Sequence, residues 1–457
     1  MQSETLVADV VVIGAGPAGG SAAIEAARGR ASVIVVETTG ELGGNGAFST
    51  GYVALSGTPF QSEIGVQDSV EKFVHDMERE VRSLEPSFHP EFDLDLAKRY
   101  ATESSDAYQF LVDIGIRFQR IIPRPRQHTT PRLLTLTDPT EFRTAFEGEF
   151  EALGVRALLR RSATKLTVGP CGRVDGVLIS SGSEEVRVSA RKAVVVAAGG
   201  FSANPDMRRK YRPLDDPYAP YVGLDTADGS GILMMQEVGA GVVNMDLIPQ
   251  YLEGPSRFME DCIAISGEGR RFFDEAGPYL ERVAALREQP GEIGYYLYDA
   301  TAAARNRQHI SELSGRPKEL ATLEQVERVI GCDPNAVTET VEKWNRLMSS
   351  ADDRDPDFGR VTFPFDRARI ETPPFTVIPI TVGIGNTNGG ARVNLDLQVL
   401  GEDGAAIPGL YAAGDCAGTM NAAMGLGGVH IGSAVTLGRI AGRNAAATRP
   451  SPLGGGI

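Results

Sequence analysis

Apolar residues recur along the N-terminal part of this chain with two periods, one typical of strands and one of helices. Residues 7–13 and 32–36 are apolar runs of strand length, and the alanine-rich residues 18–28 between them predict a helix. Residues 66–114 carry apolar side chains at helical spacing and predict a largely helical segment. Residues 192–198 predict another buried strand. The chain is therefore predicted to begin as a β-α-β unit, continue through a largely helical segment and then form another strand.

The segments between these elements differ in character. Residues 156–190 alternate between apolar and polar positions, which predicts antiparallel strands with turns at Gly169-Pro170 and Ser181-Gly182. Residues 121–132 combine prolines with basic side chains, and the prolines exclude a regular helix there. The alternation predicts a small antiparallel meander, and the prolines predict a basic loop.

The middle third of the chain has a different composition, which predicts a separate domain. Residues 241–374 contain aromatic side chains, prolines and short helical patterns, without a glycine-rich fingerprint. Glycine loops resume only after Pro373-Pro374. We therefore predict one discontinuous domain formed by residues 1–240 and 375–457, interrupted by an inserted domain formed by residues 241–374.

The turn after the first predicted strand carries glycines at the spacing of a dinucleotide-binding fingerprint. Gly14 permits a tight turn, Gly16 permits close approach of a pyrophosphate, and Gly19 permits the helix to pack on the strand. The following helix directs its positive N-terminal end toward the phosphates. Glu37 ends the second strand about 20 residues further on, where a carboxylate binds a ribose 2′-hydroxyl and disfavours the extra phosphate of NADP. The glycine spacing is weak evidence alone, but strand, helix and acid are in register.

A second segment near the C-terminus completes the cofactor hypothesis. Residues 409–413 form a short apolar run that leads into Gly414-Asp415. Flavoproteins use such a segment to hold the ribityl chain, so the two ends of the sequence predict one FAD site. Because the chain has no second dinucleotide fingerprint, the sequence does not imply a bound NAD(P)H.

Composition and charge restrict the class of protein without changing this picture. The 457 residues are 42% hydrophobic and 23% charged, which is ordinary for a soluble globular protein. The net charge of −15 argues against nucleic acid or an anionic membrane as a partner. The 4 cysteines lack metal-ligand spacing, and we predict no metal site. Without a recognisable signal or a membrane-spanning run, the sequence predicts a cytoplasmic protein.

Several motifs in order along the chain carry a family resemblance. With the residues above, the chain resembles the flavoprotein superfamily of fumarate reductases, succinate dehydrogenase flavoprotein subunits and 3-ketosteroid dehydrogenases. The resemblance implies an α/β fold: a Rossmann-type FAD-binding domain, with a parallel sheet and an antiparallel β-meander, and an inserted α+β capping domain. It also implies hydride transfer between flavin N5 and a C–C bond beside a carbonyl or carboxylate. The further motifs lie at residues 43–51, 197–201, 228–229, 269–275, 388–390, 426–428 and 438–442.

The resemblance assigns a set of expected FAD contacts. We expect non-covalent FAD, because the histidine to which membrane-bound relatives attach flavin has no counterpart around Ala47-Phe48. The expected contacts are Gly14, Gly16, Ala18, Gly19, Glu37, Gly43, Gly44, Asn45, Ser49, Gly51, Ala198, Gly199, Asp228, Gly414, Asp415, Leu426, Gly427 and Val429.

The substrate positions depart from the fumarate reductase pattern. Tyr251 and Asn386 stand where that pattern has histidines, and Gly425 stands where it has the arginine that clamps a substrate carboxylate. A C4 dicarboxylate needs such paired, charge-assisted contacts. We therefore predict a neutral or bulky substrate, such as a ketosteroid-like ketone. The ketosteroid branch matches through Glu275 and Tyr279, although Met424 replaces its tyrosine near the last glycine loop.

Six side chains are candidates for the chemistry, and each also has a purely structural interpretation. Tyr251 and Tyr279 would act as acid or base, provided that the environment lowers the pKa of the phenol from about 10. The other candidates are Arg282 as proton donor or carbonyl ligand, Asn386 as carbonyl ligand, His430 beside the flavin, and His128, within a basic cluster that would bind an anion.

Three functions remain open on the sequence alone. The first is desaturation or reduction of the C–C bond of a bulky or neutral ketone. The second is a dicarboxylate or tricarballylate-type dehydrogenase or reductase that uses Arg124, Arg126 and Arg132. The third is a flavin electron carrier or sensor without turnover, which the inserted domain argues against; a flavin monooxygenase fits less well still. The sequence does not identify the exact small-molecule substrate, the reaction direction, the electron acceptor or donor, or the oligomeric state.

Overall fold

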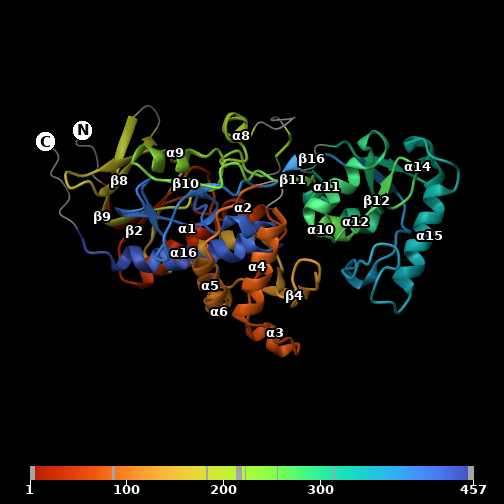
Figure 1. Cartoon of the computed structure of the whole chain (residues 1–457), viewed down its shortest axis with the longest axis horizontal. Helices are drawn as coiled ribbons and strands as arrows, with labels where there is room; N and C mark the ends of the chain where they lie inside the picture. Colours follow the sequence, from red (N-terminus) through yellow and green to blue (C-terminus); the bar gives the residue numbers. More distant parts are fainter. Residues whose placement is uncertain are drawn as a thin grey trace.

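The structure is a computed structural model, which describes residues 6–84, 88–181, 184–212, 219–221, 223–254, 256–311, 313 and 315–450. Two bodies are visible in Figure 1. The larger body contains both ends of the chain, and the smaller one, green to cyan, is formed by the middle of the sequence. The predicted turn at Ser181-Gly182 lies partly outside the described residues, whereas the turn at Gly169-Pro170 connects two antiparallel strands as expected.

The larger body is built on a sheet of eight strands within the described residues. A parallel part runs in the order β19-β9-β1-β2-β6, and β7-β8-β9 form the antiparallel meander. The predicted α/β fold class is therefore confirmed. The strands are β1 (Leu6–Ile13), β2 (Val33–Glu37), β6 (Arg156–Leu159), β7 (Ala163–Val168), β8 (Val174–Ser181), β9 (Glu184–Val196), β18 (Gln398–Leu400) and β19 (Ala406–Ala412).

Two helices from opposite ends of the chain pack closely on each other. They are α1 (Pro17–Arg28) and α16 (Val429–Ala447). A Cβ added at Gly438 would lie 2.8 Å from the Cα of Ala18, and one added at Gly442 would lie 2.7 Å from the Cα of Ala22. Only glycine permits this backbone-to-backbone approach. The helix pair fixes the C-terminal glycine loop against the N-terminal turn.

The helical segment predicted within residues 66–114 is present and lies beside this helix pair. Helix α4 (Val70–Leu84) begins where the Ser69 Oγ accepts a hydrogen bond from the Lys72 amide at 3.3 Å. Its apolar face is buried, and it packs against the short helix η4 (Asn421–Gly425). The neighbouring elements are α2 (Gly44–Phe48), β3 (Tyr52–Ala54), α3 (Pro59–Glu63), α5 (Leu94–Thr102), α6 (Ser104–Asp113), β4 (Phe118–Ile122), β5 (Leu133–Leu136) and α7 (Glu141–Leu153).

Short elements connect the two bodies and close the sheet. Strand β11 (Gln250–Leu252) pairs antiparallel with β16 (Val382–Ile384), so the chain leaves and re-enters the larger body at one place. The remaining elements of the larger body are α8 (Pro205–Tyr211), α9 (Ser230–Glu237), β10 (Val242–Val243), β17 (Gly390–Ala391) and η3 (Gly414–Cys416).

The smaller body is an α+β domain with an antiparallel sheet in the order β12-β13-β15-β14. Alternation along β12 sends Ile263 and Ile265 into one hydrophobic core and Ala264 into another, so helices cover both faces. The elements are α10 (Ser256–Glu260), β12 (Ile263–Ser266), α11 (Tyr279–Arg287), η1 (Pro290–Glu292), β13 (Gly294–Tyr298), α12 (Ala300–Arg305), α13 (Arg307–Ser311), β14 (Lys318–Leu320), α14 (Leu323–Ile330), α15 (Ala336–Ser349), η2 (Phe365–Arg367) and β15 (Phe375–Pro379).

The hydrophobic cores place the domain boundaries at the β11–β16 pair. Ile248 and Ile384 belong to the core of the larger body, whereas Leu252 and Val382 pack on the core of the smaller one. The boundary that we predicted between residues 374 and 375 is therefore too early, because β15 pairs with β13 inside the smaller sheet. We place the inserted domain between β11 and β16.

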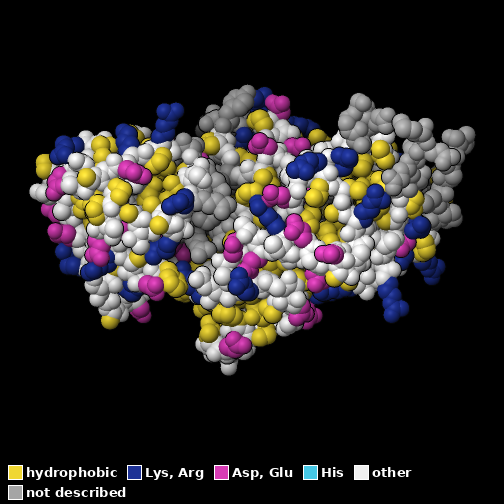
Figure 2. Space-filling view, turned by 180° about the vertical axis from the view of Figure 1, so that it is seen from behind, with side chains coloured by type: hydrophobic (Ala, Val, Ile, Leu, Met, Phe, Trp, Pro, Cys, Tyr) yellow, Lys and Arg dark blue, Asp and Glu magenta, His cyan; other side chains and the backbone are white. Residues whose placement is uncertain are grey.

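Three features bear on the expectations from composition: the distribution of surface charge, the state of the cysteines and the length of apolar helices. On the face shown in Figure 2, acidic and basic side chains are interspersed rather than separated. All four cysteines are free. No helix in the described part of the chain is long and apolar enough to cross a membrane.

Candidate functional site

A cavity of about 910 Å³ lies where the two ends of the chain meet the inserted domain. Its lining comes from the turn after β1, the end of β2, the loops around residues 198–202 and 223–230, the last glycine loop, and β11 with α11 of the inserted domain. This volume is at the upper end of the range for small-molecule sites. The cavity can therefore hold a long ligand.

The first glycine turn forms one end of this cavity. The Gly14 amide donates a hydrogen bond to the Val36 carbonyl at 2.8 Å, and its φ of +95° is accessible mainly to glycine. A Cβ added at Gly16 would meet no heavy atom within 4 Å, so this residue faces open space at the N-terminus of α1. Glu37 accepts hydrogen bonds at 2.8 Å from the amides of Ala15 and Thr39. The turn thus presents bare backbone beside a carboxylate, as a dinucleotide requires.

The last glycine loop forms the opposite wall. The Asp415 carboxylate lies 3.4 Å from His430 Nδ1, and both side chains line the cavity. The Nε2 atom of His430 is buried and has no hydrogen-bond partner among the described residues. These polar atoms are the kind that a bound ribityl chain or flavin ring would satisfy.

Most of the expected cofactor residues line the cavity. The exceptions support the backbone around it: Gly19 packs on the Gly14 carbonyl, Gly43 precedes α2, Gly51 contacts Leu136 and Pro139, and Val429 is fully buried. The expected residues in the lining are Gly14, Gly16, Ala18, Glu37, Gly44, Asn45, Ser49, Ala198, Gly199, Asp228, Gly414, Asp415, Leu426 and Gly427.

The inserted domain and its junction close the cavity with neutral side chains and the carboxyl group of Glu253. The rings of Tyr251 and Tyr279 meet edge to face with centroids 5.4 Å apart, and Asn386 and Met424 complete this end. Burial, together with the charge of Glu80, raises the pKa of Tyr251 above its ordinary value. Among the described residues, the condition that we set for Tyr251 as an acid or base, a lowered pKa, is therefore not met, and the phenol is a protonated hydrogen-bonding group.

Arg282 lies behind this end of the cavity rather than in its lining. The side chain is 2% exposed, and its guanidinium carbon lies 4.6 Å from the centroid of the Tyr279 ring. Its Nη1 contacts the Met259 sulfur at 2.8 Å, whereas Nε and Nη2 have no hydrogen-bond partner among the described residues. Burial lowers the pKa of Arg282. Arg282, which we predicted to contact the substrate, is therefore not in the described lining; it packs on Tyr279, which is.

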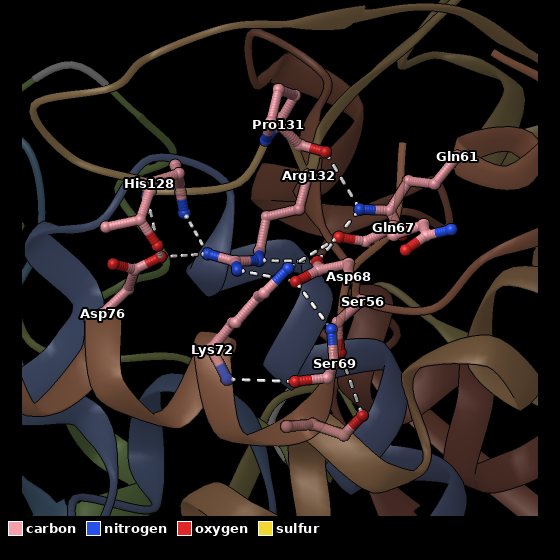
Figure 3. A network of polar contacts seen from close by, with 12 residues as sticks. Ser56, Gln61, Gln67, Asp68, Ser69, Lys72, Asp76, His128, Pro131 and Arg132 are labelled. Carbon is pink, nitrogen blue, oxygen red and sulfur yellow. Dashed lines mark hydrogen bonds and ion pairs between the residues drawn. The ribbon is translucent and has the colours of Figure 1, made fainter. Parts of the chain in front are cut away.

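His128 also lies outside the cavity lining, in the network of Figure 3. Its Nε2 lies 2.9 Å from the Gly427 carbonyl, and Arg132 lies on its other side. Burial and the Arg132 charge lower the pKa of His128 to about 3, so the ring is neutral and donates to that carbonyl. We predicted an anion-binding role for His128; the geometry instead has it supporting the last glycine loop.

The arginines of the same loop are all neutralised by carboxylates. Arg132 pairs with Asp68 at 2.8 Å and also with Asp76 (Figure 3). Arg124 pairs with Glu260, and Arg126 pairs with Glu281 across the domain boundary. None of the three lines the described cavity. The ion pairs of this basic loop therefore link the larger body to the inserted domain.

A glycine-lined dinucleotide cradle beneath a capping domain defines a flavin-dependent oxidoreductase. The donor set fits FAD, because bare glycine backbone meets a helix N-terminus at one end, and Asp415 with the unpartnered Nε2 of His430 lines the opposite wall. The sequence model of the FAD binding domain family matches residues 9–431. The chain belongs to this family, within the fumarate reductase-like flavoproteins.

Individual relatives differ in the substrates that their names give. An NADH:fumarate oxidoreductase of Klebsiella pneumoniae is 30% identical to this chain, over 96% of the chain and 47% of its own length. A urocanate reductase of Eggerthella lenta is 31% identical, over 96% of the chain and 74% of its own length. Among solved structures, a 3-ketosteroid-Δ4-(5α)-dehydrogenase of Rhodococcus jostii with bound 4-androstene-3,17-dione has a TM-score of 0.69 at 26% identity, over 96% of this chain and 97% of its own.

These relatives confirm the predicted class, FAD-dependent oxidoreductases that act on C–C bonds, at the level of the family. The chain spans between about half and three quarters of the length of the two curated relatives. Their substrates range from a dicarboxylate to a steroid ketone by name, so the substrate of this chain has to be argued from its own cavity.

Sequence reasoning missed several residues of the cavity. Tyr52, Tyr221 and Met259 line it, and Glu80 lies beside it. Tyr52 is the one that a local signal could have found, because it closely follows the glycine-rich segment around residues 43–51. The others come from distant elements and carry no motif.

Proposed function

We propose that this chain desaturates, or reduces, a C–C bond beside the carbonyl of a neutral or bulky substrate, with non-covalently bound FAD. One observation carries the proposal: among the described residues, no lysine or arginine lines the cavity. The end closed by the inserted domain instead presents two phenols, one amide, methionine sulfur and the carboxyl group of Glu253. Such a surface favours an apolar ligand with a single polar carbonyl.

The same observation disfavours a dicarboxylate substrate. Two carboxylates buried in this cavity would need compensating cations, and burying an unpaired charge costs several kcal/mol. The arginines considered for that role are already paired with Glu260, Glu281, Asp68 and Asp76. An electron carrier without turnover is disfavoured because the inserted domain closes one end of the cavity with Tyr279 and Met259, and a carrier needs no such cap.

Within this proposal, the residues of the cap act on the proton and on the carbonyl. Bound FAD supplies the hydride acceptor or donor. Tyr251 and Asn386, neutral side chains that are hydrogen-bonded to each other, bind the carbonyl oxygen and stabilise its developing negative charge. Tyr279 moves the proton at the neighbouring carbon. Arg282, packed on the Tyr279 ring, holds that phenol in place and stabilises negative charge on its oxygen.

Replacing Tyr279 with phenylalanine tests this assignment. We expect kcat to fall by about 100-fold or more, since general acid–base groups contribute at least that much. FAD content and the affinity for substrate should remain close to those of the wild type. Stopped-flow measurement of flavin reoxidation provides the rate. Tyr251→Phe is the matched variant, and we expect it to raise KM more than it lowers kcat. Equal effects of both variants on kcat would contradict the division of roles.

The substrate class can be tested directly. The flavin is photoreduced without oxygen and mixed with a panel of enones, steroids and unsaturated acids. We expect the enones or steroids to reoxidise it and fumarate to leave it reduced. If saturated ketones bleach the oxidised enzyme instead, the reaction runs as a desaturation. Reoxidation by fumarate alone would reject the proposed substrate class.

The cofactor linkage is tested by acid precipitation of the FAD-loaded protein. We expect all flavin absorbance in the supernatant, because the described segment around Ala47-Phe48 offers no histidine for attachment. Flavin retained in the pellet would show a covalent bond.

A further inference from the structure

The position of Gly425 is occupied by a side chain from a different element. A Cβ added at Gly425 would overlap Oε1 of Glu80 and lie 2.8 Å from its Cδ. Gly425 has no positive φ, so its backbone is compatible with any side chain. A side chain at position 425 would therefore have to displace the carboxyl group of Glu80, which α4 places there through its packing on η4.

This carboxyl group lies beside the cap end of the cavity, next to residues of its lining. Met424 and Leu426, which flank Gly425, line the cavity, and so does Tyr251, on which the charge of Glu80 acts. Glu80 is half-buried and close enough to this tyrosine for its charge to oppose ionisation of the phenol. An acidic group therefore occupies the region where a carboxylate-binding cation would otherwise stand.

The carboxyl group of Glu80 has no ionic partner of its own. Within the described residues it forms no hydrogen bond or ion pair: Arg79 pairs with Asp76 at 3.1 Å, and Arg126 pairs with Glu281. Burial, opposed by Arg79 and assisted by Glu281, raises the pKa of Glu80 to about 7. A half-buried carboxyl group without partners is an available hydrogen-bonding site.

We propose that Glu80 determines substrate specificity: its carboxyl group accepts a hydrogen bond from a hydroxyl or N–H group at the far end of the substrate, and it rejects a carboxylate there. The inference rests on the proposed function and names its substrate class more closely. The substrate is an enone, or the corresponding saturated ketone, with a donor group remote from the reacting bond. The rings of Tyr251 and Tyr279 offer packing surface for a flat hydrophobic body between the carbonyl and the remote donor group of the substrate.

Three probes that differ only in the remote group test the inference. They are benzylideneacetone and its 4-hydroxy and 4-carboxy derivatives, titrated into FAD-loaded full-length protein at pH 6 and pH 8. Binding is read from the change in flavin absorbance, which does not require turnover. In the wild type at pH 8 we expect the hydroxyl probe to bind about 10-fold tighter than the carboxylate probe.

Three variants distinguish the role of Glu80 from a general disturbance. In Glu80→Gln, the carboxylate probe should gain about 10-fold in affinity at pH 8 and lose its dependence on pH. In Glu80→Ala with Gly425→Arg, the preference should reverse in favour of the carboxylate. Glu71→Gln is the matched control, because this carboxylate lies on the same helix and is exposed; its probe ratios should stay within about twofold of the wild type.

A second readout verifies the placement of Glu80 without any ligand. A carboxyl group with a raised pKa contributes stability at low pH and loses it as the pH rises through its folded pKa. Relative to Glu80→Gln, the wild type should therefore lose stability between pH 4.5 and about 7.

The outcomes separate this inference from the proposed function. Unchanged probe ratios in Glu80→Gln, or no binding of any probe, would overturn the role of Glu80. If the probes bind with the expected ratios but none reoxidises the photoreduced flavin, the proposed function fails and the specificity of Glu80 stands.

Discussion

Replacing Glu275 with alanine should destabilise the capping domain by about 3–5 kcal/mol, the usual result of removing one partner from a buried ion network. Glu275 is fully buried and contacts Arg271 at 2.7 Å and Arg360 at 2.8 Å. Without it, the hydrogen-bond acceptors left to the fully buried guanidinium of Arg360 among the described residues are the backbone carbonyls of Thr362 and Glu260. The single tryptophan of the chain, Trp344, packs against both arginines, with its ring centroid 4.9 and 5.0 Å from their guanidinium carbons. Urea unfolding followed by tryptophan fluorescence therefore reports on this domain.

The matched control is an exposed ion pair beside this network. Glu339 pairs with Arg270 at 2.8 Å, and both side chains are exposed. Glu339→Ala should cost less than about 1 kcal/mol. A loss for Glu275→Ala as small as that of the control would contradict the structural role of the buried network.

Acid should remove the same contribution from the wild type. Burial alone would raise the pKa of Glu275, but Arg271 and Arg360 outweigh it and hold the value at about 2. A carboxylate with a lowered pKa stabilises the fold above its ordinary pKa of 4.5 and loses this contribution as the pH falls toward 2. The stability of Glu275→Ala should fall less steeply over that range, as measured by urea unfolding at successive pH values.

Alanine at Gly14 should abolish FAD binding and destabilise the apoprotein. The φ of +95° is strained for alanine, and the added Cβ would overlap the Ala197 carbonyl oxygen and lie 2.8 Å from its carbon. Because both atoms belong to the backbone of the sheet, neither can move aside cheaply. We expect a loss of about 3 kcal/mol or more in the apoprotein, as backbone strain with a steric clash produces. Urea unfolding of the apoprotein and fluorescence titration with FAD measure the two effects.

Gly16→Ala separates cofactor binding from folding. Its Cβ meets no protein atom within 4 Å, so the apoprotein should keep the stability of the wild type. The methyl group occupies the space that the pyrophosphate needs, and FAD affinity should fall by more than about tenfold. Full FAD affinity in Gly16→Ala would mean that the pyrophosphate does not pass over this turn.

The elements that the sequence predicted correctly are those fixed by local rules. The period of apolar residues decided strands β1 and β2 and helix α4, and the glycine spacing decided the turn between β1 and α1. Prolines excluded a helix from residues 121–132. Each of these signals lies within a short stretch of chain, so no tertiary contact was needed to interpret it.

The errors arose where distant partners decide the role of a residue. His128 and the arginines near it suggested an anion site, because the carboxylates of Asp68 and Asp76 lie more than fifty residues away in sequence. The domain boundary was too early because β15 pairs with β13 and not with the strands that follow it. Pairing across such distances leaves no local pattern.

The sequence by itself determined the cofactor: glycines and one acid at fixed spacing are enough to specify a dinucleotide turn. It also showed that glycine stands at position 425, where the fumarate reductase pattern has the arginine that clamps a substrate carboxylate. Only the tertiary structure decided what replaces that arginine, because Glu80 reaches the position from a helix more than three hundred residues earlier in the chain. The physical reason is that helix packing, and not sequence spacing, sets which side chains share a cavity.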